Sequence, residues 1–268
     1  MASVLITGCS TGIGRATAAR LAAGGRTVYA TARRPETLSE LEAAGCRTLA
    51  LDVTDDASMQ AAVDAVEGGV GVLINNAGYS QSGALETLPM ESVRRQFETN
   101  VFGLLRMCQL VLPGMRAAGA GTIVNVSSMG GRLTFPGGGA YHATKYAVEA
   151  VSDALRMEVG RFGIDVICVE PGLIRTEFGS TAASSVGDGG PYAEFNEAVA
   201  RSTREVYEGP LSRFGGDADA VAVAIEKALS KRRAPTRVPV TASARIFMGL
   251  RRVLPDRAWD RVVSSGFR

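Results

Sequence analysis

Tyr141 and Lys145 are separated by three residues at the start of an Ala- and Val-patterned stretch with helical periodicity. Side chains at positions i and i+4 of a helix share one face. A cation beside a phenol favours the phenolate and lowers a pKa that is ordinarily about 10. The pair is therefore suited to general acid–base chemistry near neutral pH. The lysine is conspicuous because the chain contains only three lysines against 26 arginines.

Three other polar residues lie close to this pair in the sequence. Ser128 ends a predicted strand thirteen residues before Tyr141, where it could donate a hydrogen bond to a substrate oxygen on which charge develops. Ser127 is expected to bond the backbone rather than to act as a second catalytic serine. His142, the only histidine, follows Tyr141 directly, but successive helical residues point about 100° apart, so we predict a structural role for it.

A glycine-rich turn follows the first apolar run of the chain. Residues 7–14 read Thr-Gly-Cys-Ser-Thr-Gly-Ile-Gly, and a helical stretch comes directly after them. Glycines allow the backbone to approach a pyrophosphate, while the helix N-terminus supplies free N–H groups and a positive dipole end. Many strand–helix turns carry glycines without a ligand, but the position after the first strand favours a dinucleotide. The lysine of a Walker-type loop is absent, which argues against nucleoside triphosphate hydrolysis.

The second predicted strand indicates which dinucleotide is bound. In dinucleotide folds an acidic residue at its end binds the ribose 2′-hydroxyl, whereas a basic residue accommodates a 2′-phosphate. Here the strand ends in Ala32-Arg33-Arg34, without an acid, and Arg15 follows the glycines. We therefore predict that NADP(H) is favoured over NAD(H). The alternative is that one or more of these arginines is only a solvated charge at a helix start.

These residues require a fold that brings the ends of several strands together. Short apolar runs alternate with longer Ala-rich helical stretches, and the runs are continuously apolar, as buried parallel strands are. This predicts an α/β fold, a Rossmann-type doubly wound parallel sheet in three layers, with residues 1–268 as a single dinucleotide-binding catalytic domain. Ligands then lie beyond the carboxyl ends of the strands. The predicted strands are Val4–Thr7, Thr27–Ala32, Arg47–Asp52, Val70–Asn75, Thr122–Ser127 and Ile164–Glu170.

Taken together, the motifs resemble those of the single-domain short-chain dehydrogenases/reductases. The matching residues occur in the family's order and spacing from residue 3 to about residue 176. Each motif alone is modest, but the combination is highly specific. The matching pieces are Thr7-Gly8-x-x-x-Gly12-x-Gly14, Asp52, Asn75-Asn76-Ala77-Gly78, Asn100, Ser128, Tyr141-x-x-x-Lys145, and Pro171-Gly172 with Thr176.

The resemblance implies a catalytic set of Asn100, Ser128, Tyr141 and Lys145. Lys145 would also bond the nicotinamide ribose, and Asn100 would hold a water that links Lys145 to solvent for proton relay. The family's usual homodimer or homotetramer is implied as well. No metal is expected.

The resemblance also implies which residues bind the cofactor. Asp52 and Val53 would border the adenine, Asn75 and Ala77 would support the central region, and residues 171–176 would hold the carboxamide end. Positions 76 and 78 are as well placed to brace the strand ends as to touch the cofactor. The whole implied set is Gly8, Ser10, Thr11, Gly12, Ile13, Arg33, Asp52, Val53, Asn75, Ala77, Tyr141, Lys145, Pro171, Gly172, Ile174 and Thr176.

Parts of the chain resemble one branch of the family more closely. Residues 75–112 and 145–149 are similar to 17-beta-hydroxysteroid, retinol and acyl-dihydroxyacetone-phosphate reductases, which implies a bulky apolar ketone or alcohol. Residues 177–210 fall where the family carries its substrate lid, and they combine a glycine- and serine-rich loop at 179–190 with a helix containing Tyr192, Phe195, Val199, Val206 and Tyr207. We predict a lid that closes over the substrate. The alternative is an inert surface loop followed by a core helix.

Residues 241–268 are predicted to form a basic helical tail, with one helix from Ala242 to Leu254. From Lys231 to Arg268 there are ten basic residues against two acidic ones. An arginine-rich amphipathic segment can lie on anionic lipid, so weak contact with a membrane surface is one reading. The other is that the tail packs over the cleft or a subunit contact and leaves its arginines solvated. No base-reading module accompanies the arginines, so nucleic-acid binding is not expected.

Composition and cysteine spacing indicate whether the protein holds a metal, is secreted or spans a membrane. The four cysteines lie far apart without a C-x-x-C pair, which predicts buried reduced thiols and no metal site. The N-terminus lacks the pattern of a secretory signal, and no stretch approaches the roughly 20 apolar residues of a transmembrane helix. A cytoplasmic protein with a small-molecule substrate is expected.

Two function classes remain. The leading hypothesis is an NADP(H)-dependent oxidoreductase that interconverts a ketone or aldehyde and an alcohol, with Tyr141 as general acid and base. The alternative is a non-catalytic dinucleotide-binding regulator, which the intact set of Ser128, Tyr141 and Lys145 disfavours. Enoyl reduction is disfavoured because it resembles family members with wider Tyr–Lys spacing.

Overall fold

Seven parallel strands form the central sheet of the computed structural model, which describes residues 2–177, 190–208 and 213–265. Their order across the sheet is β3-β2-β1-β4-β5-β6-β9, so the chain moves outward from β1 in one direction and then resumes at β4 on its other side. In open sheets of this kind, ligands bind at such a switch point, beyond the carboxyl ends of the strands. The strands are β1 Ser3–Ile6, β2 Val28–Ala32, β3 Arg47–Ala50, β4 Val70–Asn75, β5 Gly121–Val126, β6 Ile164–Pro171 and β9 Arg237–Val240.

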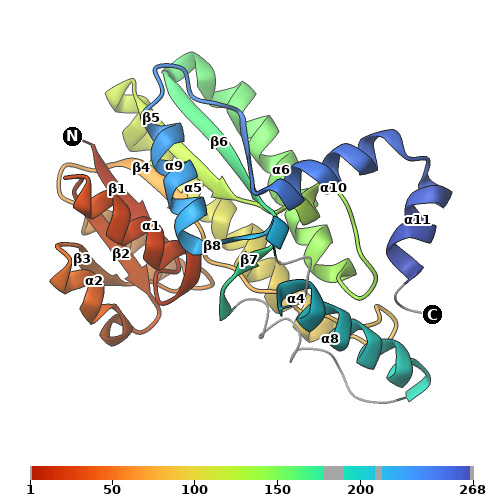
Figure 1. Ribbon diagram of the computed structural model, residues 1–268. Helices are drawn as coiled ribbons and strands as arrows, with labels where there is room; N and C mark the ends of the chain where they lie inside the picture. The colour runs from red at the N-terminus through yellow and green to blue at the C-terminus, as the bar shows by residue number, and fades with distance from the viewer. Residues whose placement is uncertain (1, 178–189, 209–212, 266–268) are drawn as a thin grey trace.

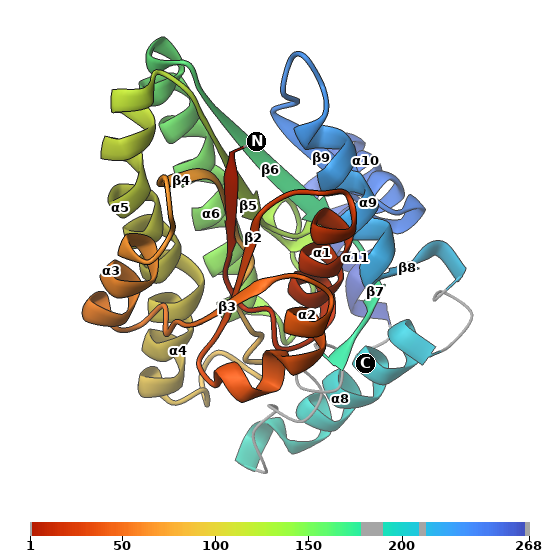
Figure 2. The same cartoon turned by 90° about the vertical axis from the view of Figure 1, so that its left-hand side faces the viewer.

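Helices cover both faces of the sheet, which confirms the predicted three-layer, doubly wound fold (Figures 1 and 2). One face carries α1 Gly12–Ala23, α2 Ser39–Ala43 and α9 Ala218–Leu229. The opposite face carries α3 Asp56–Asp64, α5 Gly103–Ala118 and α6 Gly139–Val159.

The remaining elements connect the strands and helices of the three layers or follow them in the chain. They are α4 Met90–Phe97, a π-helical turn at Glu98–Phe102, α8 Ala193–Glu208, α10 Ala242–Val253 and α11 Asp256–Ser264, a two-stranded pair of β7 Ile174–Arg175 and β8 Gly216–Asp217, and short 3-10 turns at Pro35–Leu38, Met129–Gly131, Gly160–Phe162 and Gly190–Tyr192. Within the described residues, no helix combines the length and the apolar composition needed to cross a bilayer.

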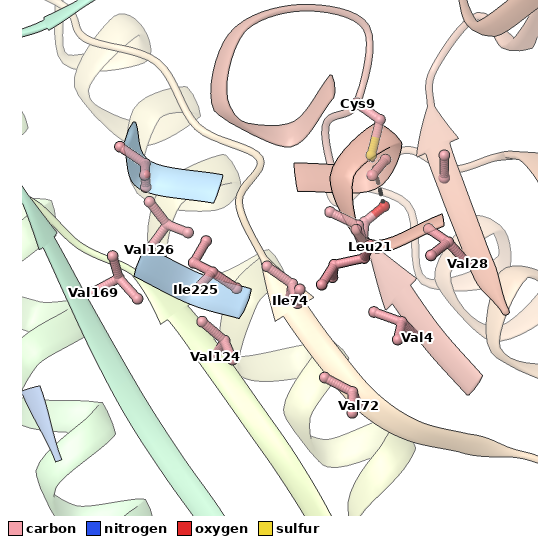
Figure 3. Close-up of a cluster of buried hydrophobic side chains, with 14 of the residues drawn as sticks. Val4, Cys9, Leu21, Val28, Val72, Ile74, Val124, Val126, Val169 and Ile225 are labelled. Atoms are coloured by element: carbon pink, nitrogen blue, oxygen red, sulfur yellow. Dashed lines mark hydrogen bonds between the residues drawn. The ribbon is translucent and has the colours of Figure 1, made fainter. Parts of the chain in front are cut away.

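Two hydrophobic cores lie on the two faces of the sheet because successive strand residues point to opposite sides. Val4 and Ile6 of β1 belong to the core under α1 and α9, which Figure 3 shows with Leu21 and Ile225. Leu5, between them, belongs to the core under α5 and α6. Because both faces of the sheet are covered, each central strand contributes apolar side chains to both cores. Burying one large aliphatic side chain stabilises the fold by roughly 1.5–3 kcal/mol.

All six predicted strands are present, with ends that differ from the prediction by no more than two residues. The seventh, β9, was not predicted. It is short, it carries Arg237 and Pro239, and it lies at the edge of the sheet, paired only with β6. A proline lacks an N–H to donate, so edge strands tolerate it while a sequence pattern reads it as a strand breaker.

The C-terminal tail packs against the carboxyl edge of the sheet rather than extending away from it. α10 begins one residue after Thr241 and matches the predicted helix. Phe247 on α10 meets Phe135 edge-on at 5.9 Å, and Trp259 on α11 donates its indole N–H to the Thr134 carbonyl at 3.3 Å. This supports the reading in which the tail covers the cleft. Residues 266–268, including the predicted Phe267, lie outside the described part.

The predicted lid is only partly described. Its loop, residues 178–189, and residues 209–210 lie outside the described chain, as do the side chains of Val206 and Tyr207. The predicted helix is present as α8, with Val199 buried and Tyr192 bonded to Glu86 at 2.7 Å. A side chain at Gly137 would collide with Val199, so α8 packs directly on the loop that leads into α6.

Candidate active site

A cavity of about 1130 Å³ opens at the carboxyl edge of the sheet, where the strand order reverses. Most of the residues predicted to bind cofactor or substrate line it. Asn75 and Asn100 are the exceptions, since both are buried beside it. The predicted residues that line the cavity are Gly8, Ser10, Thr11, Gly12, Ile13, Arg33, Asp52, Val53, Ala77, Ser128, Tyr141, Lys145, Pro171, Gly172, Ile174 and Thr176.

The glycine loop between β1 and α1 packs closely against the backbone that follows β4. Gly8 has a φ of +73°, and a Cβ built on it would lie 2.8 Å from the Cα of Ala77. A Cβ on Gly14 would lie 2.3 Å from the Gly8 carbonyl oxygen. The start of α1 has no side-chain cap and no acidic residue in its first turn. This uncapped N-terminus beside a cavity fits the pyrophosphate of a dinucleotide.

Asn76 ties the end of β4 to this loop. Its amide donates to the carbonyl oxygens of Thr7 at 3.0 Å and Gly8 at 2.9 Å. The Thr7 hydroxyl in turn accepts hydrogen bonds from the backbone N–H groups of Asn76 and Ala77. Of the two roles considered for Asn76, the structure therefore shows the bracing one, although the residue also lines the cavity.

Arg15 and Arg33, two of the three arginines proposed for a 2′-phosphate, occupy different environments. Arg33 is exposed at the edge of the cavity, and no carboxylate of the described chain pairs with it. Arg15 lies outside the cavity lining, where its guanidinium binds Glu40 at 2.9 Å and the Thr37 carbonyl at 3.0 Å. Arg15 is thus engaged by its own neighbours, while Arg33 is available to a ligand.

Lys145 lies at the base of the cavity and is almost completely buried. Its ammonium donates a hydrogen bond to the Val126 carbonyl at 2.8 Å and lies 5.8 Å from the centre of the Tyr141 ring. Burial lowers the pKa of Lys145 to about 8, against the opposing influence of Cys168 and Glu149. The lysine is therefore close to its titration point near neutral pH, beside the phenol that it is expected to influence.

Ser128 lines the same cavity as Tyr141. Its hydroxyl oxygen accepts a hydrogen bond from the Gly130 N–H at 3.0 Å, which leaves its own proton to be donated. The expectation for Ser127 was wrong in detail. Its backbone N–H pairs with Val169, but its buried hydroxyl has no hydrogen-bond partner among the described residues. A Cβ at Gly131 would lie 2.8 Å from that hydroxyl, so a side chain would not fit there, and Ser127 also lines the cavity.

Asn100 lies in the π-helical turn that joins α4 to α5. Its amide nitrogen donates to the Tyr79 carbonyl at 2.9 Å and to the Thr144 hydroxyl at 3.0 Å, and its oxygen accepts from the Tyr79 N–H at 3.1 Å. A Cβ on Gly78 would lie 3.0 Å from the Asn100 oxygen and 3.8 Å from the Lys145 nitrogen. Asn100 therefore connects Tyr79, in the segment that follows β4, to Thr144 on α6, next to Lys145.

The side chain of Asn75, which the resemblance implied to support the cofactor's central region, is buried in the core. Its side-chain amide donates to Asn125 at 3.0 Å and to the Cys108 sulfur at 3.3 Å, and Asn125 continues to Ser152 at 3.0 Å. These contacts cross the face of the sheet under α5 and α6. The side chain of Asn75 thus links strands to helices inside the core.

His142 stabilises the loop between β5 and α6. Its Nε2 accepts a hydrogen bond from the Phe135 N–H at 3.3 Å, and its Nδ1 donates to the Gly130 carbonyl at 3.1 Å. These partners require the neutral ring, and burial lowers the pKa of His142 to about 4. The contacts agree with the structural role predicted for it.

The family model for short chain dehydrogenases matches residues 2–186. The chain belongs to the short-chain dehydrogenase family. This agrees with the resemblance inferred from the motifs.

Individual members of the family align over nearly the full length of this short-chain dehydrogenase. The oxidoreductase YbbO of Escherichia coli K12 is 35% identical over 98% of this chain and 94% of its own. The NADPH-dependent 3-dehydrocapnine reductase of Ornithobacterium rhinotracheale is 32% identical over 98% and 96%. The crystal structure of a short-chain dehydrogenase from Streptomyces avermitilis is 37% identical and superposes with a TM-score of 0.83, covering 100% of this chain and 99% of that one. The dehydrogenase is accordingly an NAD(P)-dependent oxidoreductase that acts on CH–OH and C=O groups.

One cluster of charged residues in the dehydrogenase was not predicted. Glu149 on α6 and Glu170 on β6 are buried side by side, and Arg237 of β9 lies 3.1 Å from the first and 3.4 Å from the second. Arg132 approaches Glu170 at 3.6 Å. Burial, together with the charge of Glu149, raises the pKa of Glu170 to about 7. The sequence signal for this cluster was a glutamate inside the apolar run of β6. Its arginine partners could not be predicted, because they come from distant segments of the chain.

Proposed function

We propose that this short-chain dehydrogenase interconverts a bulky apolar ketone or aldehyde and the corresponding alcohol with NADP(H), using Tyr141 as the general acid and base. The observation that supports the proposal is that Ser128, Tyr141 and Lys145 line one cavity. Tyr141 and Ser128 face the cavity, and the buried ammonium of Lys145 lies beside the Tyr141 ring.

The residues at the switch point fit a dinucleotide. The glycine loop and the uncapped start of α1 suit the pyrophosphate, and the exposed Arg33 suits a 2′-phosphate. Asp52, Val53, Ala77 and the segment 171–176 would hold the rest of the cofactor. A bound nicotinamide supplies or accepts the hydride. NADPH is named for the 3-dehydrocapnine reductase, and the preference for it over NADH is carried to this chain only as a proposal.

The protein's own residues would handle the proton. In the reductive direction the Tyr141 hydroxyl gives its proton to the carbonyl oxygen, while Ser128 donates a hydrogen bond to the same oxygen. The Lys145 ammonium stabilises the phenolate that remains. Asn100 is a positioning residue, because its contacts hold the Tyr79 and Thr144 segments on either side of Lys145. The reverse reaction uses the same groups.

The substrate side of the cavity supports an apolar molecule. Phe135 and Leu173 line it, and Phe247 on α10 and Val262 and Val263 on α11 add to the wall. Phe135 lies 6.0 Å from the Trp259 ring and 5.9 Å from Phe247, so the wall is built around one aromatic cluster. We further propose that the chain is one domain, that residues 177–210 act as a lid, and that a cytoplasmic homodimer or homotetramer is the working form.

The test is the Tyr141→Phe variant assayed beside Tyr146→Phe, a half-exposed tyrosine one turn further along the same helix. NADPH oxidation is followed with a series of ketones of increasing apolar size, and cofactor binding is followed by nicotinamide fluorescence. We expect Tyr141→Phe to lose turnover and keep cofactor binding, while Tyr146→Phe keeps both. Full turnover in Tyr141→Phe would refute the proposal. Cofactor binding by the unmodified protein without turnover of any ketone or alcohol would favour the dinucleotide-binding regulator instead.

A further inference from the structure

The outer face of helix α10 combines exposed apolar side chains with exposed arginines. Ile246 is 53% exposed and Val253 is 73% exposed, and their spacing of seven residues places them on one side of the helix. Arg245 and Arg252 each directly precede one of them, so the two arginines form an adjacent row about 100° around the helix, and both are exposed. The helix contains no acidic residue. This set of Arg245, Ile246, Arg252 and Val253 is called the α10 outer face below.

The arginines of α10 fall into two groups. Arg251 binds Asp256 at 2.6 Å and lies over the Trp259 ring at 5.9 Å, so it takes part in packing α10 against α11. Arg245 and Arg252 have no carboxylate partner in the part of the chain that the structure describes. Their positive charge is therefore available to something outside the molecule.

The same two helices also border the mouth of the cavity. Phe247, one residue after Ile246, lines the cavity from the inner side of α10. Val262 of α11 lines it too and is still 49% exposed. In Figure 1, α10 and α11 lie together on one side of the molecule, away from β1, β2 and β3. Helices α10 and α11 therefore carry both the outer face and part of the cavity mouth.

We propose that the α10 outer face, together with Val262, docks on the surface of an anionic lipid bilayer. A helix of this type lies in the interface, with its apolar side chains inserted among the lipids and its arginines at the charged headgroups. Twelve residues with two inserted aliphatic side chains make a weak and reversible contact. The docking does not depend on which substrate is reduced, although it would place the cavity mouth at the bilayer.

A second copy of this chain is the competing occupant of the face. A two-fold contact around α10 would place the Arg245 and Arg252 of one copy near those of the other, because such interfaces use the same patch on both partners. The α10 outer face supplies no carboxylate to offset that repulsion. Anionic lipid supplies the missing negative charge, so the charge pattern favours the bilayer.

Vesicle sedimentation with the full-length protein tests the proposal. Vesicles of phosphatidylcholine alone are compared with vesicles that also contain phosphatidylserine. We expect binding only to the anionic vesicles, and we expect it to decrease as salt rises from about 0.1 M to about 1 M, since the Debye length falls from about 10 Å to about 3 Å. Absence of binding to anionic vesicles at the lower salt concentration would overturn the proposal.

Variants of exposed residues assign the binding to this face. Arg245→Glu with Arg252→Glu should lower the vesicle partition coefficient by more than about tenfold, because each basic residue near the surface contributes about 1 kcal/mol. Ile246→Ser with Val253→Ser should also weaken it. Arg26→Glu with Arg94→Glu changes the net charge equally and Met157→Ser removes an exposed apolar side chain elsewhere, so these controls should bind like the unmodified protein.

The competing occupant has its own signature. If the α10 variants bind vesicles normally but change the sedimentation equilibrium of the protein in solution, the face is a subunit contact and the lipid proposal is wrong. Circular dichroism of each variant confirms that the fold is retained, which is expected because all the altered side chains lie on the surface or at its edge.

Discussion

The Lys145 ammonium lies 2.8 Å from the carbonyl oxygen of Val126, at the end of a central strand and almost completely out of contact with water. A strand-end carbonyl is a neutral partner, so the lysine carries its charge without a directly bonded carboxylate. The pKa of Lys145 falls to about 8 because burial penalises the charged form. The group proposed to assist Tyr141 is therefore held at a cost to the stability of the fold.

Replacing this lysine should stabilise the protein. Between pH 8 and 10.5 the unfolded chain holds the Lys145 proton and the folded chain does not, so stability from this group rises with pH and is lowest below pH 8. At pH 7 we expect Lys145→Met to raise the free energy of unfolding by up to about 3 kcal/mol, less the lost hydrogen bond. Urea unfolding at pH 7 and pH 10 measures it, with the exposed Lys227→Met as control. A variant less stable than the original at pH 7 would contradict this.

The two arginines near the glycine loop should contribute unequally to cofactor choice. Arg33 is exposed at the cavity edge, whereas Arg15 is bound to Glu40 and the Thr37 carbonyl. Arg33→Ala should weaken NADPH binding by about tenfold or more while leaving NADH binding nearly unchanged, because a charge-assisted hydrogen bond contributes about 1.5–3 kcal/mol. Arg15→Ala should change the ratio much less. Fluorescence titration with both nucleotides measures these affinities. Equal losses of affinity for NADPH and NADH in Arg33→Ala would contradict the assignment of Arg33 to the 2′-phosphate.

The glycine loop should be intolerant of even one carbon atom. Gly8→Ala would place a Cβ 2.8 Å from Ala77 at a φ of +73°, so the loop or strand β4 has to move. We expect a loss of stability of roughly 1–3 kcal/mol together with weaker dinucleotide binding. Gly114→Ala in α5 is the matched control, because nothing lies within 4 Å of its Cβ and helix propensity favours alanine. Thermal unfolding with and without NADPH measures both effects.

Two buried groups should make opposite contributions to acid stability. The pKa of Glu170 is raised to about 7 from 4.5 mainly by burial, so its contribution to stability decreases as pH rises from 4.5 to 7. The pKa of His142 is lowered to about 4 by burial, so its contribution decreases as pH falls from 6.5 to 4. The two trends partly cancel in the unmodified protein.

Glu170→Gln separates these contributions. Above pH 7 the variant should be more stable than the original, by up to about 3 kcal/mol less the lost ion pairs with Arg132 and Arg237. The advantage should shrink toward pH 4.5, where Glu170 is protonated in both states. Chemical unfolding from pH 4.5 to 8 records the difference, and the exposed Glu158→Gln serves as control. A difference that does not depend on pH would show that Glu170 titrates normally.

Much of this arrangement could be predicted because the decisive signals are local. Each strand of the sheet centre is a continuous apolar run, and the glycine loop, Ser128, Tyr141 and Lys145 follow or face strand ends in a fixed order. The strand β9 could not be predicted from local pattern, since its pairing with β6 is set by the edge position and it carries Pro239.

The hydrogen-bond partners of several residues also could not be predicted, because those partners lie far away in the sequence. Arg15 is engaged by Glu40, which lies on another helix, and the turn of Asn75 toward Asn125 depends on the packing of α5. The π-helical turn at Asn100 has no composition that distinguishes it from an ordinary helix. Local motifs therefore predicted which residues gather at the cavity, but not which of them are already occupied by neighbours.

The cavity has walls from opposite ends of the chain. The glycine loop comes from the first residues, whereas Phe247 and Val262 come from the last two helices, after the sheet is complete. We expect substitutions of Phe247 and Val262 to reshape the recess, because both side chains line it and neither belongs to the sheet or to the reacting groups. Natural selection can therefore retarget this architecture by exchanging its final segment, and a laboratory graft of α10 and α11 from another member would be a direct route to altered specificity.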